Sequence, residues 1–409
     1  MQLFGNSEWL ILMTAIIWAC GDKQMEAIKR VRLSEIAELI TKGTTPTTLG
    51  YNFQEDGVNF LKIECFSEDG TYIKEKTAHI SEECHEKLKR SKLRTGDILF
   101  SIAGAIGRVA VVTEEMLPAN TNQALAIIRV TRDDIYLPYI KLILTSQIVK
   151  AQFERKKQGV AQLNISLKDI NELEIPLPEK SKQIECASLL EKISGIITAR
   201  QKQLQKLDDL VKARFIELFG EPLSNQKGWQ TMSIVEAAPI KSQRGDLADE
   251  VWLLNLDAVE AQTGTVLFKH RVQSGEINAS TVYFTAESVL YSKLRPYLNK
   301  VVMPDEDGVA TSEMIPMYPL ADRLNRAYLC YWLRSDAFVR HISEKVAGAK
   351  MPRVSMDYFR SLAIEMPPLE LQEQFAAFVE QIDKSKVAVQ KALDEAQLLF
   401  DSLMQKYFG

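Results

Sequence analysis

The side chains of this chain that could do chemistry are basic and polar groups gathered in short runs. Residues 87–94 form one such run, and another lies in the later half of the chain at residues 293–300. Clustered Lys and Arg contact nucleic-acid phosphates, while Asn, Gln, Arg and Lys on loops hydrogen-bond to base edges. A single charge run is more often a solvated face. Because basic runs occur at corresponding places in both halves of the chain, they favour a surface that binds DNA.

The sequence shows no motif that would place an active site on this chain. It has no G-x-x-x-x-G-K-[ST] loop, no complete G-x-G-x-x-G loop, and no Asn/Asp-Pro-Pro-aromatic stretch typical of amino-methyltransferases. Four side chains that could ligate zinc lack the spacing of fingers or ribbons: Cys65, His79, Cys84 and His85. We therefore expect no catalytic residue, metal or cofactor on this chain. An enzyme whose active site no motif reveals stays open as an alternative.

Composition indicates an ordinary globular protein with more than one domain. At roughly 100–200 residues per domain, the 409 residues favour two to four structural units. The net charge of −4 means that DNA contacts must come from local basic patches. The five cysteines are widely spaced and form no CxxC pair, so we expect reduced thiols in a cytoplasmic protein.

An apolar run at residues 9–20 stands apart from the rest of the chain. It is too short to span a membrane, and no positive charge precedes it as a signal peptide requires. We expect either a buried helix or an extension upstream of a natural start near Met25.

The chain repeats itself at an offset of 189 residues. The stretch QGVAQLNISLKDINELEIPLPEKSKQ, which ends at Gln183, returns without a gap as AGAKMPRVSMDYFRSLAIEMPPLELQ, which ends at Gln372. The match continues to Phe219-Gly220 and Phe408-Gly409. Inside each copy, runs rich in β-branched and aromatic residues predict strands, such as ILFS at 98–101. Such a duplication predicts two similar domains.

Each copy ends in a long helix with a heptad seam. Apolar residues recur in alternating steps of three and four over about five turns or more, as a helix pair requires. We expect the two seams to pack against each other, although two separate surface helices would also explain them. The predicted packing residues are Leu190, Ile193, Ile197, Leu204, Leu207, Val211 and Leu218 in the first helix, and Val379, Ile382, Val389, Leu393, Phe400 and Leu403 in the second.

Four stretches resemble the specificity (S) subunit of type I restriction–modification enzymes. They are GDILFSIAGAIGRVAVV, QGVAQLNISLKDINELEIPLPEKSKQI with its echo ending IEMPPLELQEQF, FIELFGEPLSNQKGW, and the terminal YFG. The likeness covers residues 28–409. It implies an α+β fold in which two similar target recognition domains are joined by two long antiparallel coiled-coil helices with pseudo-twofold symmetry. The domain organisation expected from it is an extension at 1–27, domains at 28–178 and 222–367, and spacer helices at 179–221 and 368–409.

The resemblance also implies a function. Each domain would read one half of a bipartite double-stranded DNA target, and the helices would set the spacing between the halves. The chain would have no catalysis of its own. It would dock two modification (methyltransferase) subunits and, through them, ATP-dependent restriction subunits. Only those partners would bind S-adenosylmethionine, ATP and Mg, and the complex would be cytoplasmic, without a membrane contact.

The predicted DNA-contacting residues lie on loops that are expected to vary with the target. In the second copy KLRPYL replaces the glycine loop SIAGAIG of the first. Each candidate could instead be a turn or cap residue. A scaffold whose repeats bind protein and not DNA would fit the helices equally well, but the matching basic runs disfavour it. The candidates are Lys42, Thr44, Thr45, Ser101, Asn120, Asn122 and Gln162 in the first copy, and Arg244, Lys293, Arg295, Tyr297 and Arg353 in the second.

Overall fold

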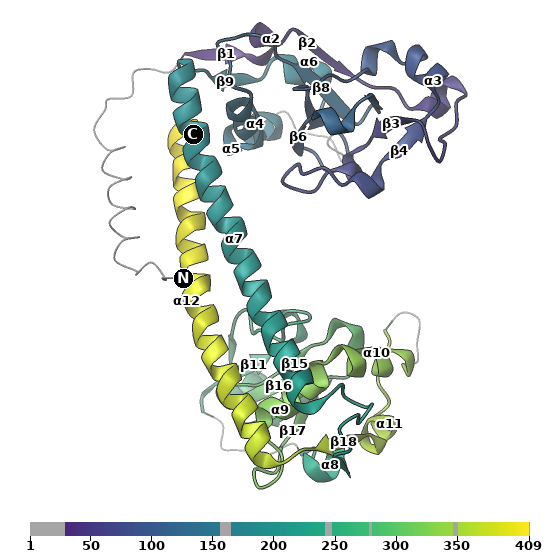
Figure 1. Cartoon of the computed structure of the whole chain (residues 1–409). Coiled ribbons are helices and arrows are strands. Elements are labelled where there is room, and N and C mark those ends of the chain that lie inside the picture. The colour runs from purple at the N-terminus through teal and green to yellow at the C-terminus, as the bar shows by residue number, and fades with distance from the viewer. Residues whose placement is uncertain (1–28, 156–164, 242–247, 278–279, 347–350, 409) are drawn as a thin grey trace. The chain divides into compact units, whose positions relative to one another are not determined.

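The chain forms two compact units that mix helices with short strands. The computed structural model describes residues 29–155, 165–241, 248–277, 280–346 and 351–408. The first unit comprises Met1–Ile197 and Glu395–Gly409, and the second comprises Thr198–Asp394. Each unit holds its own small sheets and short helices, together with parts of two long helices (Figure 1). The predicted α+β fold with two similar domains and two long helices is confirmed.

The first unit has three small sheets. In order they are β1-β9, β2-β8-β5-β6 and β4-β3-β7. Its strands are β1 (Arg30–Arg32), β2 (Leu39–Lys42), β3 (Val58–Leu61), β4 (Ala78–Ile80), β5 (Ile98–Ser101), β6 (Val109–Val111), β7 (Ala119–Thr121), β8 (Leu125–Arg129) and β9 (Glu174–Pro176). Its α-helices are α2 (Leu33–Ile36), α3 (Glu82–Lys87), α4 (Leu137–Thr145), α5 (Gln147–Arg155), α6 (Leu167–Asn171) and the start of α7 (Lys180–Phe219).

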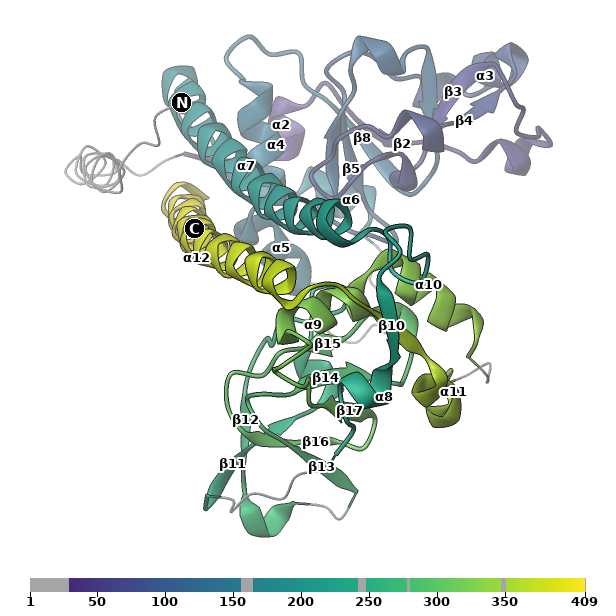
Figure 2. The ribbon, with the colours of Figure 1, turned by 60° about the horizontal axis from the view of Figure 1, so that its bottom comes forward.

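The second unit repeats this plan with the same number of described strands, but β13 has no counterpart in the first unit and no described strand of the second unit corresponds to β2. Its sheets are β10-β18, β12-β11-β16-β13 and β15-β14-β17 (Figure 2). Its strands are β10 (Gln230–Ser233), β11 (Glu250–Leu254), β12 (His270–Gln273), β13 (Thr281–Phe284), β14 (Val289–Ser292), β15 (Val301–Val302), β16 (Gly308–Thr311), β17 (Met314–Met317) and β18 (Ala363–Met366). Its α-helices are α8 (Ile234–Ala237), α9 (Arg326–Arg334), α10 (Asp336–Glu344), α11 (Met356–Ser361) and the start of α12 (Leu369–Phe408).

The strands at the centre of each unit are apolar on both faces. All four residues of β5 and all four of β14 are buried, which explains why their sequences read as continuous runs and not as an alternating pattern. The predicted strand at 98–101 is β5, which pairs antiparallel with β6. At the start of β5, Asp97 accepts two hydrogen bonds of 2.7 Å from Arg129 of β8, and these raise the pKa of the Arg129 guanidinium. This buried pair ties the first residues of β5 to its neighbour.

The two long helices run antiparallel within each unit. In the second unit Asp208 of α7 pairs with Lys386 of α12 at 2.5 Å, and further along α7 the Phe215 ring lies 5.3 Å from that of Phe375. Going forward along α7 therefore means going backward along α12, and both views show these segments side by side (Figures 1 and 2). The predicted seam residues are either buried or half-buried. Those buried are Leu190, Ile193, Ile197, Val211, Val379, Ile382, Val389 and Leu403, and those half-buried are Leu204, Leu207, Leu218, Leu393 and Phe400.

A buried glutamine ties the start of each long helix to its domain. The Gln183 side chain is only 1% exposed; it donates to the carbonyls of Asp134 (3.1 Å) and Pro178 (2.8 Å) and accepts from the Tyr136 N–H (2.9 Å). Gln372 makes the same three contacts in the second unit. Its amide donates to two carbonyls at 3.1 and 2.8 Å and its oxygen accepts from an N–H at 2.8 Å; these partners are Arg323, Pro367 and Asn325.

The far end of each long helix packs on a buried tyrosine of the unit in which that end lies. Phe219, at the end of α7, lies 4.7 Å from the Tyr328 ring, and Phe408, at the end of α12, lies 5.4 Å from the Tyr139 ring. Each tyrosine hydroxyl donates at 2.9 Å to a carbonyl of the last strand before a long helix. Burial raises the pKa of both hydroxyls, so each stays a protonated donor. The helix-packing prediction omitted these aromatic residues because they lie outside the seam positions used.

Two further expectations concern the compartment of the protein. Cys65, Cys84, Cys186 and Cys330 are free and buried, while Cys20 and the apolar run at 9–20 lie outside the described residues. Among the described helices, none is long and apolar enough to cross a membrane.

Replacing Gln183 by Ala should weaken the first unit by about 3 kcal/mol, because one N–H and two carbonyls lose the buried side chain that pairs with them. Gln372→Ala should weaken the second unit similarly. Hydrogen exchange read by mass spectrometry would assign each effect to its unit. The control is Gln201→Ala, an exposed position on α7, which should change stability by less than about 0.5 kcal/mol. Equal protection in Gln183→Ala and in the control would contradict the anchoring role.

Candidate nucleic-acid interface

Three loops of the first unit leave the same end of the β2-β8-β5-β6 sheet. Ala126 of β8 pairs with Lys42 at the end of β2 and with Phe100 near the end of β5. The chain after β2, before β8 and after β5 therefore emerges side by side. This arrangement brings together four predicted DNA-contacting residues: Lys42, Thr44, Thr45 and Asn122.

Close backbone packing holds two of these loops in place. The N–H of Gly43 donates to the carbonyl of Asn122 at 3.1 Å, and a Cβ on Gly43 would stand 1.7 Å from the Thr121 carbonyl oxygen. A residue with a side chain therefore cannot occupy position 43 unless the loops move apart. Across the same contact, the Thr45 hydroxyl donates to the side-chain oxygen of Gln123. The neighbouring Lys42 and Thr44 side chains remain exposed, so a cation and a hydroxyl are available to a DNA strand.

Two of the predicted contact residues do not belong to this surface. Ser101 is buried and its hydroxyl donates to the Ala103 carbonyl at 3.0 Å, so it shapes the loop after β5. Asn120 is also buried, with all of its amide hydrogen bonds made inside the unit. Because the polar groups of both side chains already have internal partners, this structure does not present them to DNA.

Asn120 instead positions the basic run. Its amide donates to the Leu88 carbonyl (3.0 Å) and the Ser91 hydroxyl (3.1 Å), and its oxygen meets Nδ1 of His85. These contacts fix α3 and the short helix η4 (Lys89–Ser91) against β7. As a result, the exposed Arg90 lies beside the end of β2, with its guanidinium 3.5 Å from the Thr41 hydroxyl. Arg90 was not among the predicted contacts, although the run at 87–94 was the signal that could have found it.

The second unit gathers its predicted residues at the corresponding end of β14. The backbone of Lys293 accepts from the Val354 N–H at 3.0 Å, and the Arg295 N–H donates to the Pro352 carbonyl at 2.8 Å. These bonds hold the loop after β14 against the segment before α11. They bring together Lys293, Arg295, Tyr297 and Arg353, of which Tyr297 is 47% exposed. Gln162 and Arg244 lie outside the described residues.

One cation of this second cluster is already neutralised. The Arg353 guanidinium donates to both carboxylate oxygens of Glu313, with the shortest contact at 2.8 Å, and this raises the pKa of Arg353. Glu313 also carries the carbonyl that accepts from the Lys293 N–H at 3.0 Å. The sequence reasoning missed Glu313, because nothing in the chain order pairs it with residue 353.

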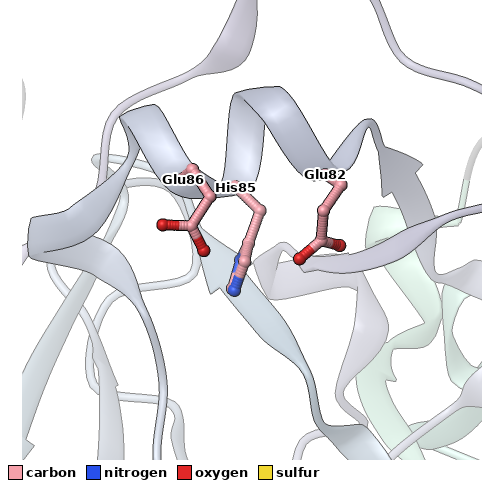
Figure 3. Close-up of side chains that lie close together, drawn as sticks. All are labelled: Glu82, His85 and Glu86. Carbon is pink, nitrogen blue, oxygen red and sulfur yellow. The ribbon is translucent and has the colours of Figure 1, made fainter.

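A histidine and two glutamates on α3 form the one grouping with metal-ligand geometry among the described residues. Glu82 and Glu86 lie on either side of the His85 ring, with their ligand atoms within 4.8 Å of one another (Figure 3). Glu86 already pairs with Lys92, which lowers the pKa of the carboxyl, and the ring is held by Asn120. These contacts explain the arrangement without an ion, and we assign no metal to it.

The chain matches a known protein family and several solved structures. The family model described as type I restriction modification DNA specificity domain matches the chain twice, at residues 25–208 and 226–396. Among solved structures, the chain is similar to a chain from work described as "Structural basis underlying complex assembly and conformational transition of the type I R-M system". That likeness has a TM-score of 0.59 at 16% identity and covers 94% of this chain and 99% of the other. The S subunit of a type I restriction–modification system from M. genitalium has a TM-score of 0.52 at 14% identity, over 95% and 98%.

Curated relatives include specificity subunits of type I restriction enzymes from two organisms. The EcoBI subunit of Escherichia coli is 29% identical over 178 residues, which is 42% of this chain but 37% of that protein. The MjaIX subunit of Methanocaldococcus jannaschii is 20% identical over 407 residues, or 92% of this chain and 91% of the relative. The chain thus matches well under half of the first relative and most of the second. Since the family model covers most of the sequence, the chain belongs to the type I restriction modification DNA specificity family and carries its domain twice.

Proposed function

We propose that this chain is the non-catalytic subunit that recognises DNA for a type I restriction–modification complex. Each unit would read one half of a bipartite double-stranded target. The observation that carries the proposal is that each copy of the specificity domain gathers exposed basic and polar side chains on loops at the same end of an equivalent sheet. Loops of this kind supply hydroxyls, amides and guanidinium groups, the donors and acceptors that read base edges and hold phosphates.

The long helices would set the distance between the half-sites. Each begins at a buried glutamine anchor and ends on a buried tyrosine, so neither end can slide along its domain without breaking several internal contacts. Neighbouring half-sites of dimeric DNA-binding proteins are likewise spaced by the geometry of the protein that links the readers.

The outer faces of the helices would dock two methyltransferase subunits. In the second unit an open, largely apolar groove is lined by Met303, Ala327, Val379 and Val387, and Val387 is 70% exposed. Exposed apolar side chains on a helix favour a protein partner. Those subunits would carry S-adenosylmethionine and the methyl-transfer chemistry, and ATP-dependent restriction subunits would join through them.

Replacing residues 222–346 with the matching segment of a related specificity subunit should change one half of the methylated motif and leave the other intact. The reason is that the loop after β14 lies in that segment, while the loops of the first unit do not. Sequencing of genomic methylation in cells that co-express the partner subunits measures this. The matched control exchanges residues 36–155 and should change the other half. A concerted change of both halves, or of neither, would contradict two independent readers.

Four residues inserted at Ala199 should lengthen the unspecified gap between unchanged half-sites. They add about 6 Å along the helix, which corresponds to roughly one or two base pairs at 3.4 Å each. Four is not a multiple of seven, so the seam must locally unwind to absorb them. The substitution Lys202→Ala, at an exposed position on α7, serves as the control and should leave the gap as it was. An active insertion variant that still methylates sites with the original gap would refute the spacing role.

A further inference from the structure

The loop after β14 and the loop after β5 share one backbone design but carry different side chains. We call them the Arg295 loop, residues 293–300, and the Gly104 loop, residues 102–108. In each, the last serine of the strand donates its hydroxyl at 3.0 Å to the carbonyl two residues later. The N–H of the same serine donates to the carbonyl of the last loop residue, at 2.9 Å in one unit and 3.0 Å in the other. These matched bonds place Arg295 where the first unit has Gly104.

That position requires a left-handed backbone. Gly104 has φ 72°, which costs glycine nothing because it lacks a Cβ. Arg295 adopts φ 50° and ψ 62°, a conformation that is sterically unfavourable for a residue with a side chain. The following Pro296 restricts its neighbour further. The second unit therefore holds an arginine where a glycine would fit without strain.

Surrounding hydrogen bonds prevent the strain from relaxing. The Arg295 N–H donates to the Pro352 carbonyl at 2.8 Å, and its carbonyl accepts from the Leu298 N–H at 2.9 Å. The side chain of Gln262 donates to the Tyr297 carbonyl at 2.9 Å and ties down the tip of the loop. Strained backbone that its surroundings hold in place is typical of functional sites.

No internal contact of the side chain compensates for this strain. Within the described part of the chain, the exposed Arg295 guanidinium makes no hydrogen bond or ion pair, and neither does the Lys293 ammonium. The adjacent carboxylate, Glu313, is already paired with Arg353. The first unit has uncharged residues at the matching places: Ile102, Gly104 and Ala124. The strained arginine thus adds a charge to this surface without adding an internal contact.

We propose that Arg295 binds a phosphate of the DNA backbone and so positions the second unit on the duplex without reading its sequence. The loop is tied down to Gln262 and to residues 352–354, and does not extend freely into a groove. A guanidinium held near the body of the domain is placed to contact the phosphates of the DNA strand that borders the groove. Lys293 and Tyr297, at alternate positions along the loop, are side chains of types that also contact phosphates. This inference rests on the proposed function.

The test compares Arg295→Gly and Arg295→Gln in the complete complex with its partner subunits. Both variants remove the charge, but only the glycine relieves the backbone strain. Binding would be measured with a synthetic duplex that carries the methylated motif and with a scrambled duplex, from about 50 to about 200 mM salt. Both variants should bind roughly three- to tenfold more weakly at low salt on either duplex, and the slope of log Kd against log salt should fall by about 1. The methylated motif should not change.

Thermal unfolding tests the argument from strain separately from DNA binding. Arg295→Gly should unfold at a higher temperature than Arg295→Gln, although both lose the same charge. Lys391→Gln, which removes an exposed charge from α12, is the control and should leave the salt slope unchanged.

Each contrary result has its own meaning. Wild-type affinity and slope in both variants, with a wild-type complex that binds the motif, would overturn the phosphate contact alone. A changed base in the second half-site would overturn it in favour of base reading, and a lower unfolding temperature for the glycine variant would remove the argument from strain. A wild-type complex with no affinity for either duplex would instead overturn the proposed function.

Discussion

A buried glutamine at the start of each long helix is the contact on which the arrangement of each unit depends. The side chains of Gln183 and Gln372 are buried, and each pairs with two carbonyls and one N–H. Unpaired buried polar groups are costly, so the helix can start at one place only. The same domain receives the end of the other long helix on a buried tyrosine. Both ends of each long helix are thus held by side-chain contacts to a domain.

The two units use one scaffold to present different surfaces. In the first, Gly43 permits two loops to touch, and Asn120 holds a basic turn beside them. In the second, the Arg295 loop carries charge where its counterpart carries none. The strands, helices and internal hydrogen bonds that recur set where the loops emerge, whereas the exposed side chains differ between copies. A chain with a net charge of −4 can therefore present local positive patches.

The candidate site could be anticipated only in outline. Loop composition pointed to Lys42, Thr44, Thr45 and Asn122, which lie together, and to the residues around Lys293, which also cluster. It also pointed to Ser101 and Asn120, which are buried here, since polar residues of these types serve equally well as internal hydrogen-bond partners. Arg90 and Glu313 were missed because their relevance depends on contacts between segments far apart in the chain.

The duplication, the mixed α+β class, the two long helices and the family could all be read from the amino-acid sequence. Each of these features produces a local or periodic pattern in the sequence: a constant offset of 189 residues, heptad spacing, and characteristic stretches in a fixed order. Tertiary structure alone decided which polar side chains are buried, which cation is paired with a carboxylate, and which backbone position is left-handed. These properties arise where strands and loops that are distant in sequence meet. Arg295 is an example. Its strain and its exposed charge follow from Pro352 and Glu313, neither of which adjoins it in the chain.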